Sequence, residues 1–138
     1  MKSRFILVAV ALAVMVAVAW RYYPSPEPEA QAGPPMVEVN VPTLDATAAA
    51  GEAAFNERCA VCHGQNAAGK DGVAPPLVHI IYEPNHHADE SFHWAAKQGV
   101  RAHHWPFGDM PPVEGITDNE LVRIIAYVRA LQRANGIF

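Results

Sequence analysis

Cys59-Ala60-Val61-Cys62-His63 is the stretch of this chain that decides its fold. These five residues form a C-x-x-C-H motif, which is the signature for covalent attachment of a c-type haem. Each thiol can add across one vinyl group of the haem, and the histidine can then coordinate the iron. The chain holds two cysteines in all, and both lie in this motif. The spacing therefore predicts one haem c, held through Cys59 and Cys62, with His63 as an axial iron ligand.

Closely spaced cysteines also occur in structural disulfides, in thioredoxin-like redox pairs and as half of a zinc site. A zinc ribbon needs a second C-x-x-C, which the sequence lacks. A redox dithiol has no need of a histidine directly after its second cysteine. Haem attachment is therefore the interpretation that the motif favours.

The first 23 residues contain an apolar run from Phe5 to Trp20. This run is longer than the apolar part of most signal peptides and shorter than a comfortable membrane span. Ala17-Val18-Ala19 fits a cleavage site, whereas Trp20-Arg21-Tyr22-Tyr23 resembles the aromatic and basic border of a membrane helix. We expect residues 1–23 to be a retained membrane anchor, with a cleaved signal peptide as the alternative.

The positive charges at the start of the chain predict its orientation. Lys2 and Arg4 hold the N-terminus in the cytoplasm, so the rest of the chain lies outside the membrane. Attachment of haem c is completed on that side. We expect the protein at the bacterial inner membrane with its domain facing the periplasm, or soluble in the periplasm if residues 1–19 are removed.

A proline-rich segment follows, with six prolines between Pro24 and Pro42. Such a composition favours a semi-extended tether. Val37-Glu38-Val39-Asn40-Val41 alternates like a strand but has no obvious partner, so we interpret it as tether or as a strip docked on the domain. We place the folded domain at residues 43–138.

The charge of the chain is strongly asymmetric. All 14 acidic residues but only seven of the ten basic residues lie from Pro24 onward, which gives that part a formal charge of −7. An acidic domain is not expected to bind nucleic acid. It suits redox partner proteins that present basic residues near their own redox centres.

Three helices are predicted from their caps and apolar patterns: Ala48–Ala60, Glu90–Gln98 and a helix from Thr117 to about Asn135. Asp45 or Thr47 can cap the first helix, and Asp89 can cap the second. Thr117-Asp118-Asn119-Glu120 is a capping box for the third. Because the intervening segments are rich in proline and glycine, we expect an all-α fold of three to five helices around one covalent haem.

Further residues match a known family in their order along the chain: Gly51, Phe55, Pro75-Pro76-Leu77, Met110-Pro111-Pro112 and Tyr127. Together with the haem motif, they make roughly residues 46–134 resemble a class I c-type cytochrome. The resemblance implies a single-haem domain whose first and last helices cross at close range. In that crossing Gly51 would let the backbones approach, and Phe55 would contact Tyr127.

The second nitrogen of an iron-bound histidine should donate to a backbone carbonyl. The resemblance assigns this acceptor to Pro75, in the turn that ends at Leu77. For the sixth ligand of the iron the folded unit offers one methionine, Met110, which follows His63 by 47 residues. Its soft thioether favours ferrous iron. The indole N–H of Trp105 could donate to a haem propionate, with ordinary core packing as the alternative.

Six further histidines do not belong to this pattern: His79, His86, His87, His93, His103 and His104. Any of them could replace Met110 on the iron. The pairs His86-His87 and His103-His104 could together bind copper or zinc, since imidazole suits both metals. The alternative is that they are solvated loop histidines or lie near the propionates.

We therefore expect an electron-transfer protein whose haem cycles between ferrous and ferric states, not an enzyme. The sequence contains no nucleophile–base arrangement, paired acidic site or phosphate-binding loop above chance. Its partners would be membrane or periplasmic redox proteins. Two alternatives stay open: a haem that binds small ligands or peroxide, and a copper-handling protein that uses the loop histidines.

Overall fold

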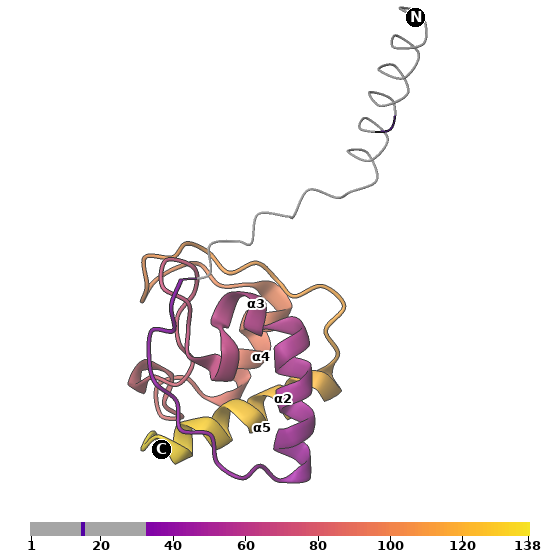
Figure 1. The fold of residues 1–138 in the computed structure, drawn as a ribbon, viewed down its shortest axis with the longest axis vertical. Coiled ribbons are helices and arrows are strands. Elements are labelled where there is room, and N and C mark those ends of the chain that lie inside the picture. The colour runs from indigo at the N-terminus through magenta and orange to yellow at the C-terminus, as the bar shows by residue number, and fades with distance from the viewer. Residues whose placement is uncertain (1–14, 16–32) are drawn as a thin grey trace, which may run out of the picture. The chain divides into compact units, whose positions relative to one another are not determined.

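The computed structural model describes Met15 and residues 33–138. Within residues 33–138 the chain forms four α-helices and two short 3-10 helices: α2 (Ala46–Arg58), α3 (Ala60–His63), η1 (Gln65–Ala67), η2 (Ile80–Tyr82), α4 (Asp89–Gln98) and α5 (Asp118–Ala134). Two isolated β-bridges take the place of strands in this part of the chain. The predicted all-α fold is therefore confirmed (Figure 1).

The expected membrane anchor or signal peptide falls almost entirely outside the described residues, as does the first half of the proline-rich tether. Among the residues that the structure does describe, no helix is long and apolar enough to cross a membrane.

The fold is organised by the crossing of α2 and α5 (Figure 1). Gly51 lies at the crossing point, where a Cβ atom would stand 1.9 Å from the carbonyl oxygen of Arg123. Only glycine allows the two backbones this approach. One turn later the rings of Phe55 and Tyr127 meet with their centroids 5.6 Å apart, and both side chains are fully buried. The close crossing that the family resemblance implied is thus present.

The helix ends differ in part from the predicted ones. The Asp45 carboxylate caps α2 by accepting from the N–H of Ala48 at 2.8 Å. This helix ends at Arg58, and Ala60 instead begins the separate helix α3. The prediction that Asp89 caps the middle helix is wrong. Asp89 is the first residue of α4, and Ala88 is the N-cap. The carboxylate of Asp89 does not cap the helix, because it accepts from the side chain of Arg129 at 2.7 Å.

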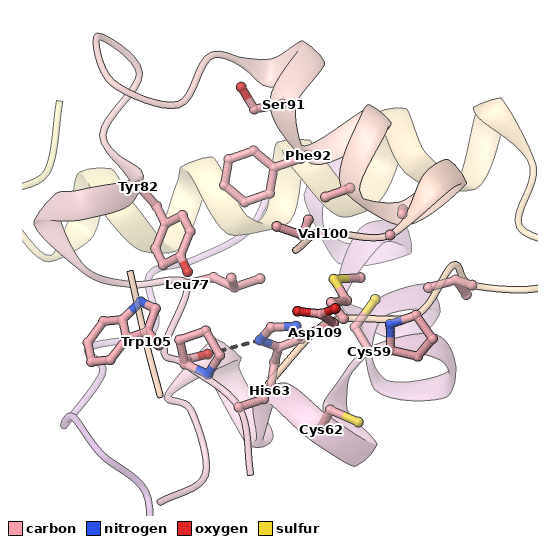
Figure 2. Close-up of a pocket in the computed structure, with 18 of the residues that line it drawn as sticks. Cys59, Cys62, His63, Leu77, Tyr82, Ser91, Phe92, Val100, Trp105 and Asp109 are labelled. Atoms are coloured by element: carbon pink, nitrogen blue, oxygen red, sulfur yellow. Dashed lines mark hydrogen bonds between the residues drawn. The ribbon is translucent and has the colours of Figure 1, made fainter. Parts of the chain in front are cut away.

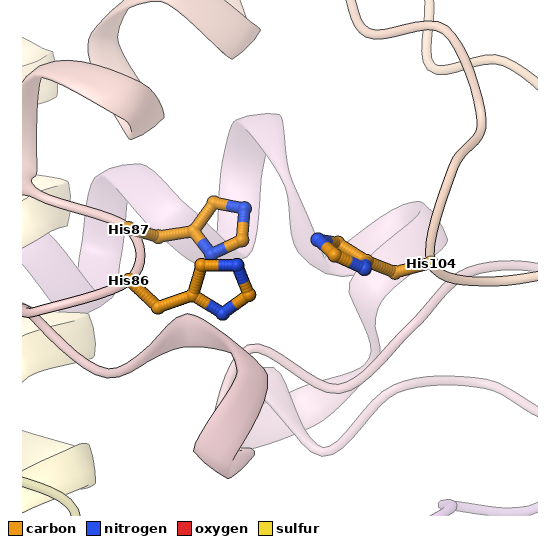
Figure 3. A group of neighbouring side chains, drawn as sticks. All are labelled: His86, His87 and His104. Atoms are coloured by element: carbon orange, nitrogen blue, oxygen red, sulfur yellow. The ribbon is translucent and has the colours of Figure 1, made fainter.

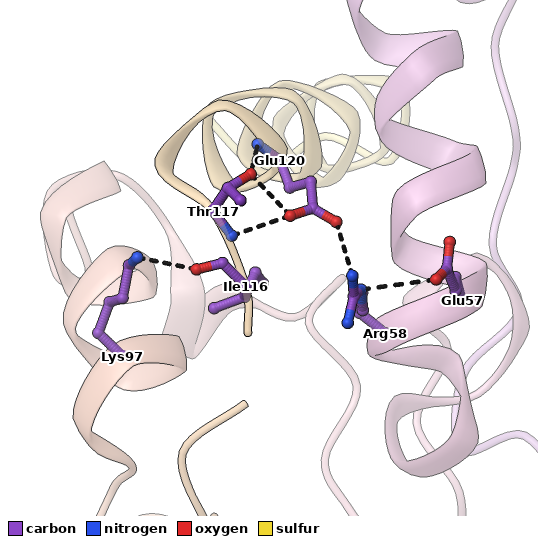
Figure 4. A network of polar contacts seen from close by, with 6 residues as sticks. All are labelled: Glu57, Arg58, Lys97, Ile116, Thr117 and Glu120. Carbon is purple, nitrogen blue, oxygen red and sulfur yellow. Dashed lines mark hydrogen bonds and ion pairs between the residues drawn. The ribbon is translucent and has the colours of Figure 1, made fainter. Parts of the chain in front are cut away.

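The predicted capping box of α5 is present and also reaches helix α2 (Figure 4). The Glu120 carboxylate accepts from the Thr117 N–H at 2.8 Å, while the Thr117 hydroxyl accepts from the Glu120 N–H at 3.2 Å. The other oxygen of Glu120 accepts from Arg58 at 3.1 Å. Since Arg58 directly precedes Cys59, this contact fixes the start of α5 against the end of α2 beside the haem motif.

Residues 33–42 lie against the domain. They therefore form a strip docked on its surface and not a free tether. The N–H groups of Met36 and Val37 donate to the carbonyl of Ala68 at 3.1 and 3.3 Å. Farther along, the side chain of Asn135 both donates to and accepts from the backbone of Asn40 at 2.9 Å. Residues 33–42 therefore belong to the same compact unit as the predicted domain of residues 43–138.

Candidate functional site

A cavity of about 660 Å³ opens between α3, α4, α5 and the loops that join them (Figure 2). Apolar side chains from all of these elements contribute to its wall. The seven predicted site residues all line this one cavity: Cys59, Cys62, His63, Pro75, Leu77, Trp105 and Met110. Its size lies within the range of pockets that bind small molecules and cofactors.

His63 is held in a single orientation at the end of α3. Its Nδ1 atom lies 2.9 Å from the carbonyl oxygen of Pro75, which is the contact that the family resemblance implied (Figure 2). The ring is 8% exposed, and this burial lowers the pKa of His63 below its usual value. The histidine is therefore neutral at pH 7, with Nδ1–H donating to Pro75 and the lone pair of Nε2 available to a metal.

Cys59 directly precedes α3, and Cys62 lies within it. Cys59 is half-buried at the junction of α2 and α3, whereas Cys62 is exposed. Burial raises the pKa of the Cys59 thiol to about 11, so the free side chain stays protonated at neutral pH. A helix junction thus presents both sulfur atoms to the cavity, one from within its wall and one at its rim.

Met110 is positioned by a closed loop that begins after α4. An antiparallel bridge joins Met110 to Val100 through two backbone hydrogen bonds of 2.9 Å. Gly99 permits this approach, because its φ is +79° and a Cβ atom would lie 2.5 Å from the Met110 carbonyl oxygen. Within the loop, the Asp109 carboxylate accepts from the N–H of Ala102 at 2.8 Å. These hydrogen bonds hold the backbone of Met110 in place, and the residue forms part of the cavity wall.

Trp105 carries a buried donor that lacks a partner. The Nε1 atom of its indole is shielded from solvent and lacks a hydrogen bond of good geometry within the described part of the chain, although the side chain of Tyr82 lies near it. The ring itself is packed against Phe107 at a centroid distance of 5.9 Å and against the edge of His79 at 5.2 Å. A buried N–H that is left without an acceptor is costly. An apolar cavity with an orphaned donor in its wall suits a large apolar ring system that carries acidic substituents, as haem does.

Residues 48–132 match the family model described as Cytochrome c. The chain belongs to the cytochrome c family. No curated protein and no solved structure matches it. Members of this family bind haem covalently and are generally electron carriers, and Cys59 and Cys62 have the spacing of the attachment motif. Haem c is therefore the cofactor of this cytochrome c, so the predicted cofactor and the prediction of a c-type cytochrome are confirmed.

One residue that positions part of the cavity wall, Arg129, was not predicted from the sequence. Arg129 of α5 is only 7% exposed, and its guanidinium donates to the carbonyl of Tyr82 at 2.8 Å, to that of His87 and to the side chain of Gln132 at 2.6 Å. It also lies 4.9 Å from the centre of the Phe92 ring. This arginine fastens the loop between η2 and α4 to α5.

A signal for Arg129 was present in the sequence. The apolar face of α5 contains Ile125 and Val128, and Arg129 lies four residues after Ile125, in register with that face. A charged residue at a core position of a helix is rarely buried unless it is paired. This register therefore predicts a buried, paired arginine, although it does not reveal the partners.

The histidines outside the haem motif fall into two groups. His79 caps η2 through its Nδ1 atom, and His93 lies 3.2 Å from the carboxylate of Asp118. The other four cluster together at one edge of the domain: His86, His87, His103 and His104. Three of these four also line the haem cavity, namely His87, His103 and His104. Desolvation and the neighbouring imidazoles lower the pKa of His104.

Proposed function

We propose that this cytochrome c shuttles single electrons between redox partner proteins, with His63 and Met110 as the two axial ligands of its haem iron. The ligand pair is supported because both residues line the same cavity. A hydrogen bond to the Pro75 carbonyl orients the ring of His63, and backbone hydrogen bonds to Val100 hold Met110. Bound haem c supplies a reversible one-electron couple, and a thioether ligand raises its reduction potential. If His63 and Met110 both bind the iron, no coordination position would be left for a substrate, which favours electron transfer.

The remaining predicted residues have complementary tasks. Cys59 and Cys62 would anchor the haem on either side of α3 through two thioether bonds. Leu77 supplies apolar wall beside the Pro75 carbonyl, and Trp105 would donate its unpaired N–H to a propionate of the haem. Together these residues would hold the haem in one position through the redox cycle, which would favour electron transfer.

The surface favours partners of opposite charge. The formal charge of −7 from Pro24 onward would attract a basic partner and speed encounter at low salt. Close to the cavity, the side chains of Val61 and Trp94 are 69% and 59% exposed. Exposed apolar side chains near the cavity suit a transient electron-transfer contact, in which a small apolar area lets the partners separate again.

Replacement of the proposed sulfur ligand tests this function. Met110→Leu preserves the volume of the side chain but removes its sulfur, so we expect the sulfur-to-iron charge-transfer band of the ferric protein to disappear and the reduction potential to fall. Met36→Leu is the matched control, because Met36 lies outside the cavity wall. It should keep the band and the potential. A Met110→Leu protein that retains the band would show that another residue ligates the iron.

The same experiment separates electron transfer from ligand-binding chemistry. A six-coordinate haem binds carbon monoxide slowly, because the sixth ligand must first leave. The reduced wild-type protein should therefore bind carbon monoxide slowly, and Met110→Leu should bind it rapidly. Rapid binding by the wild type would favour a ligand-binding or peroxidase-like haem, with His103 or His104 as acid–base groups in the cavity wall.

We also propose that residues 1–23 anchor the domain at the outer face of a bacterial inner membrane. The proposal is supported by the charges of Lys2 and Arg4, by the apolar run from Phe5 to Trp20 and by a cofactor that is attached outside the membrane. The protein should fractionate with membranes and need detergent for release. A mature N-terminus at Trp20 would contradict the anchor and indicate a soluble periplasmic carrier.

A further inference from the structure

Four histidines from two separate loops meet at the edge of the haem cavity. His86 and His87 belong to the loop between η2 and α4, while His103 and His104 belong to the loop that follows α4. The ring of His104 lies with its centroid 5.3 Å from that of His86 and 5.3 Å from that of His87. Figure 3 shows the first two rings side by side, with His104 facing them from the opposite loop.

The ring nitrogens of three of these residues are close enough to share one ion. One nitrogen each from His86, His87 and His104 lies within 4.8 Å of the other two. Because zinc binds imidazole at about 2.0–2.1 Å, the nitrogens of a tetrahedral site stand ~3.3 Å apart. Each pair would thus have to close by roughly 1.5 Å at most. His86 and His104 are exposed, so rotation of their side chains can supply this movement.

The central ring of this group is already oriented as metal-binding histidines are. The Nδ1 atom of His87 lies 2.7 Å from the carbonyl oxygen of Ile81. The N–H at Nδ1 donates to this carbonyl, which leaves the lone pair of Nε2 free. A hydrogen bond from the second nitrogen to a backbone carbonyl is the usual way in which proteins fix the tautomer and the plane of a ligating histidine.

Both loops are pinned at their backbones. The N–H groups of His86 and His87 donate to the carbonyl of Glu83 at 3.0 and 2.8 Å, and the buried Arg129 donates to the carbonyl of His87. The opposite loop is closed by the bridge between Val100 and Met110. The imidazoles are therefore brought together by the fold itself, and little backbone ordering remains to oppose metal binding.

Nothing in the described part of the chain neutralises these rings. None of its ion pairs includes His86, His87, His103 or His104. Protonated imidazoles this close would repel one another, whereas neutral imidazoles can share a cation. The three-histidine donor set contains neither a thiolate nor a carboxylate. It therefore suits a late transition metal such as copper or zinc, and not calcium or magnesium, which prefer oxygen ligands.

We propose that His86, His87 and His104 form a second metal site, distinct from the haem iron, that binds one Cu²⁺ or Zn²⁺ ion. Three protein ligands leave a further position open to water or to an exogenous ligand. His87 and His104 also line the haem cavity, so the bound ion would lie at the rim of that cavity. The haem function proposed above does not depend on this site, whereas the site requires that none of its three histidines is a ligand of the haem iron.

Metal titration of the full-length holoprotein tests the proposal. After treatment with a chelator and buffer exchange, calorimetric titration with Zn²⁺ should show one equivalent bound with a dissociation constant on the order of micromolar or lower. His104→Gln and His86→Gln should each weaken binding by roughly tenfold or more. Both positions are exposed, so the substitutions should leave the fold intact. His93→Gln, whose histidine pairs with Asp118 away from the cluster, is the matched control.

Spectroscopy decides between a metal site and a role in the haem site. When one equivalent of Cu²⁺ is added to the fully oxidised protein, the electron paramagnetic resonance signal of copper should show hyperfine splitting from nitrogen ligands. His104→Gln should lose part of this splitting. The haem absorption spectrum should be unchanged by His86→Gln, because His86 is not among the residues that line the haem cavity. Absence of stoichiometric Zn²⁺ binding, or equal affinity in His104→Gln and wild type, would overturn the proposal. So would a shift of the haem spectrum in His86→Gln, since that histidine would then act on the haem.

Discussion

Arg129→Met removes the charge that fastens the loop between η2 and α4 to α5, while keeping a long apolar side chain in its place. The arginine side chain is 8% exposed and is paired with the Asp89 carboxylate, which is 61% exposed. It also donates to the backbone of Tyr82 and His87. The substitution leaves these acceptors without their donor, and methionine offers no replacement.

The expected cost follows from these partners. Breaking a buried ion pair by removing one side costs about 3–5 kcal/mol, chiefly because the other charge is left uncompensated. Here the remaining carboxylate of Asp89 is largely solvated and costs little, so the loss comes mainly from the backbone carbonyls that lose a charged donor, at about 1.5–3 kcal/mol for such a hydrogen bond. The Tyr82 carbonyl keeps a second donor in Gln132 at 3.1 Å, but the His87 carbonyl loses its contact with α5. We expect a loss of about 3 kcal/mol in the free energy of unfolding.

Guanidinium unfolding of the holoprotein, followed by far-ultraviolet circular dichroism, measures this loss. Arg133→Met is the matched control, because Arg133 lies one turn later in α5, is exposed and forms no ion pair in the described part of the chain. It should change the stability by less than about 0.5 kcal/mol. If Arg129→Met were within about 1 kcal/mol of this control, the buried network would not stabilise the loop as we infer.

Two further substitutions address the helix crossing and the capping box. Gly51→Ala should destabilise the protein by at least ~1 kcal/mol in denaturant unfolding, because a Cβ atom 1.9 Å from the Arg123 carbonyl oxygen forces the helices apart. This cost outweighs the gain of about 1 kcal/mol in helix propensity from glycine to alanine. A variant as stable as wild type would contradict the tight crossing. Hydrogen bonds from Thr117, and then the charge of Arg58, lower the pKa of Glu120. The ionised carboxylate therefore stabilises the fold above the ordinary glutamate pKa, and this stabilisation is lost as the pH falls through the lowered pKa. Glu120→Gln should therefore weaken the acid dependence of the thermal midpoint, whereas Glu114→Gln in an exposed loop should leave it unchanged; equal pH profiles for both variants would refute the assignment.

Features encoded within a few consecutive residues could be predicted from the sequence. The C-x-x-C-H motif specified the cofactor, because the thiols and the imidazole must follow one another in a single turn to reach the same haem. The capping box from Thr117 to Glu120 located the start of α5, since both of its hydrogen bonds join residues three apart. Asp89 shows the limit of this reasoning. A carboxylate before a helix can cap it, but a buried guanidinium from another helix is a stronger partner.

Features that join distant segments were decided by the tertiary structure. The family resemblance anticipated the Pro75 contact of His63 and the meeting of Phe55 with Tyr127, but spacing alone gives no reason for either. The histidine cluster is the clearest case. The two histidine pairs are separated by α4, and the sequence could name them only as possible partners. They meet because Arg129 holds one loop on α5 while the bridge to Met110 closes the other. Such placement depends on packing between helices, which no local pattern of residues records.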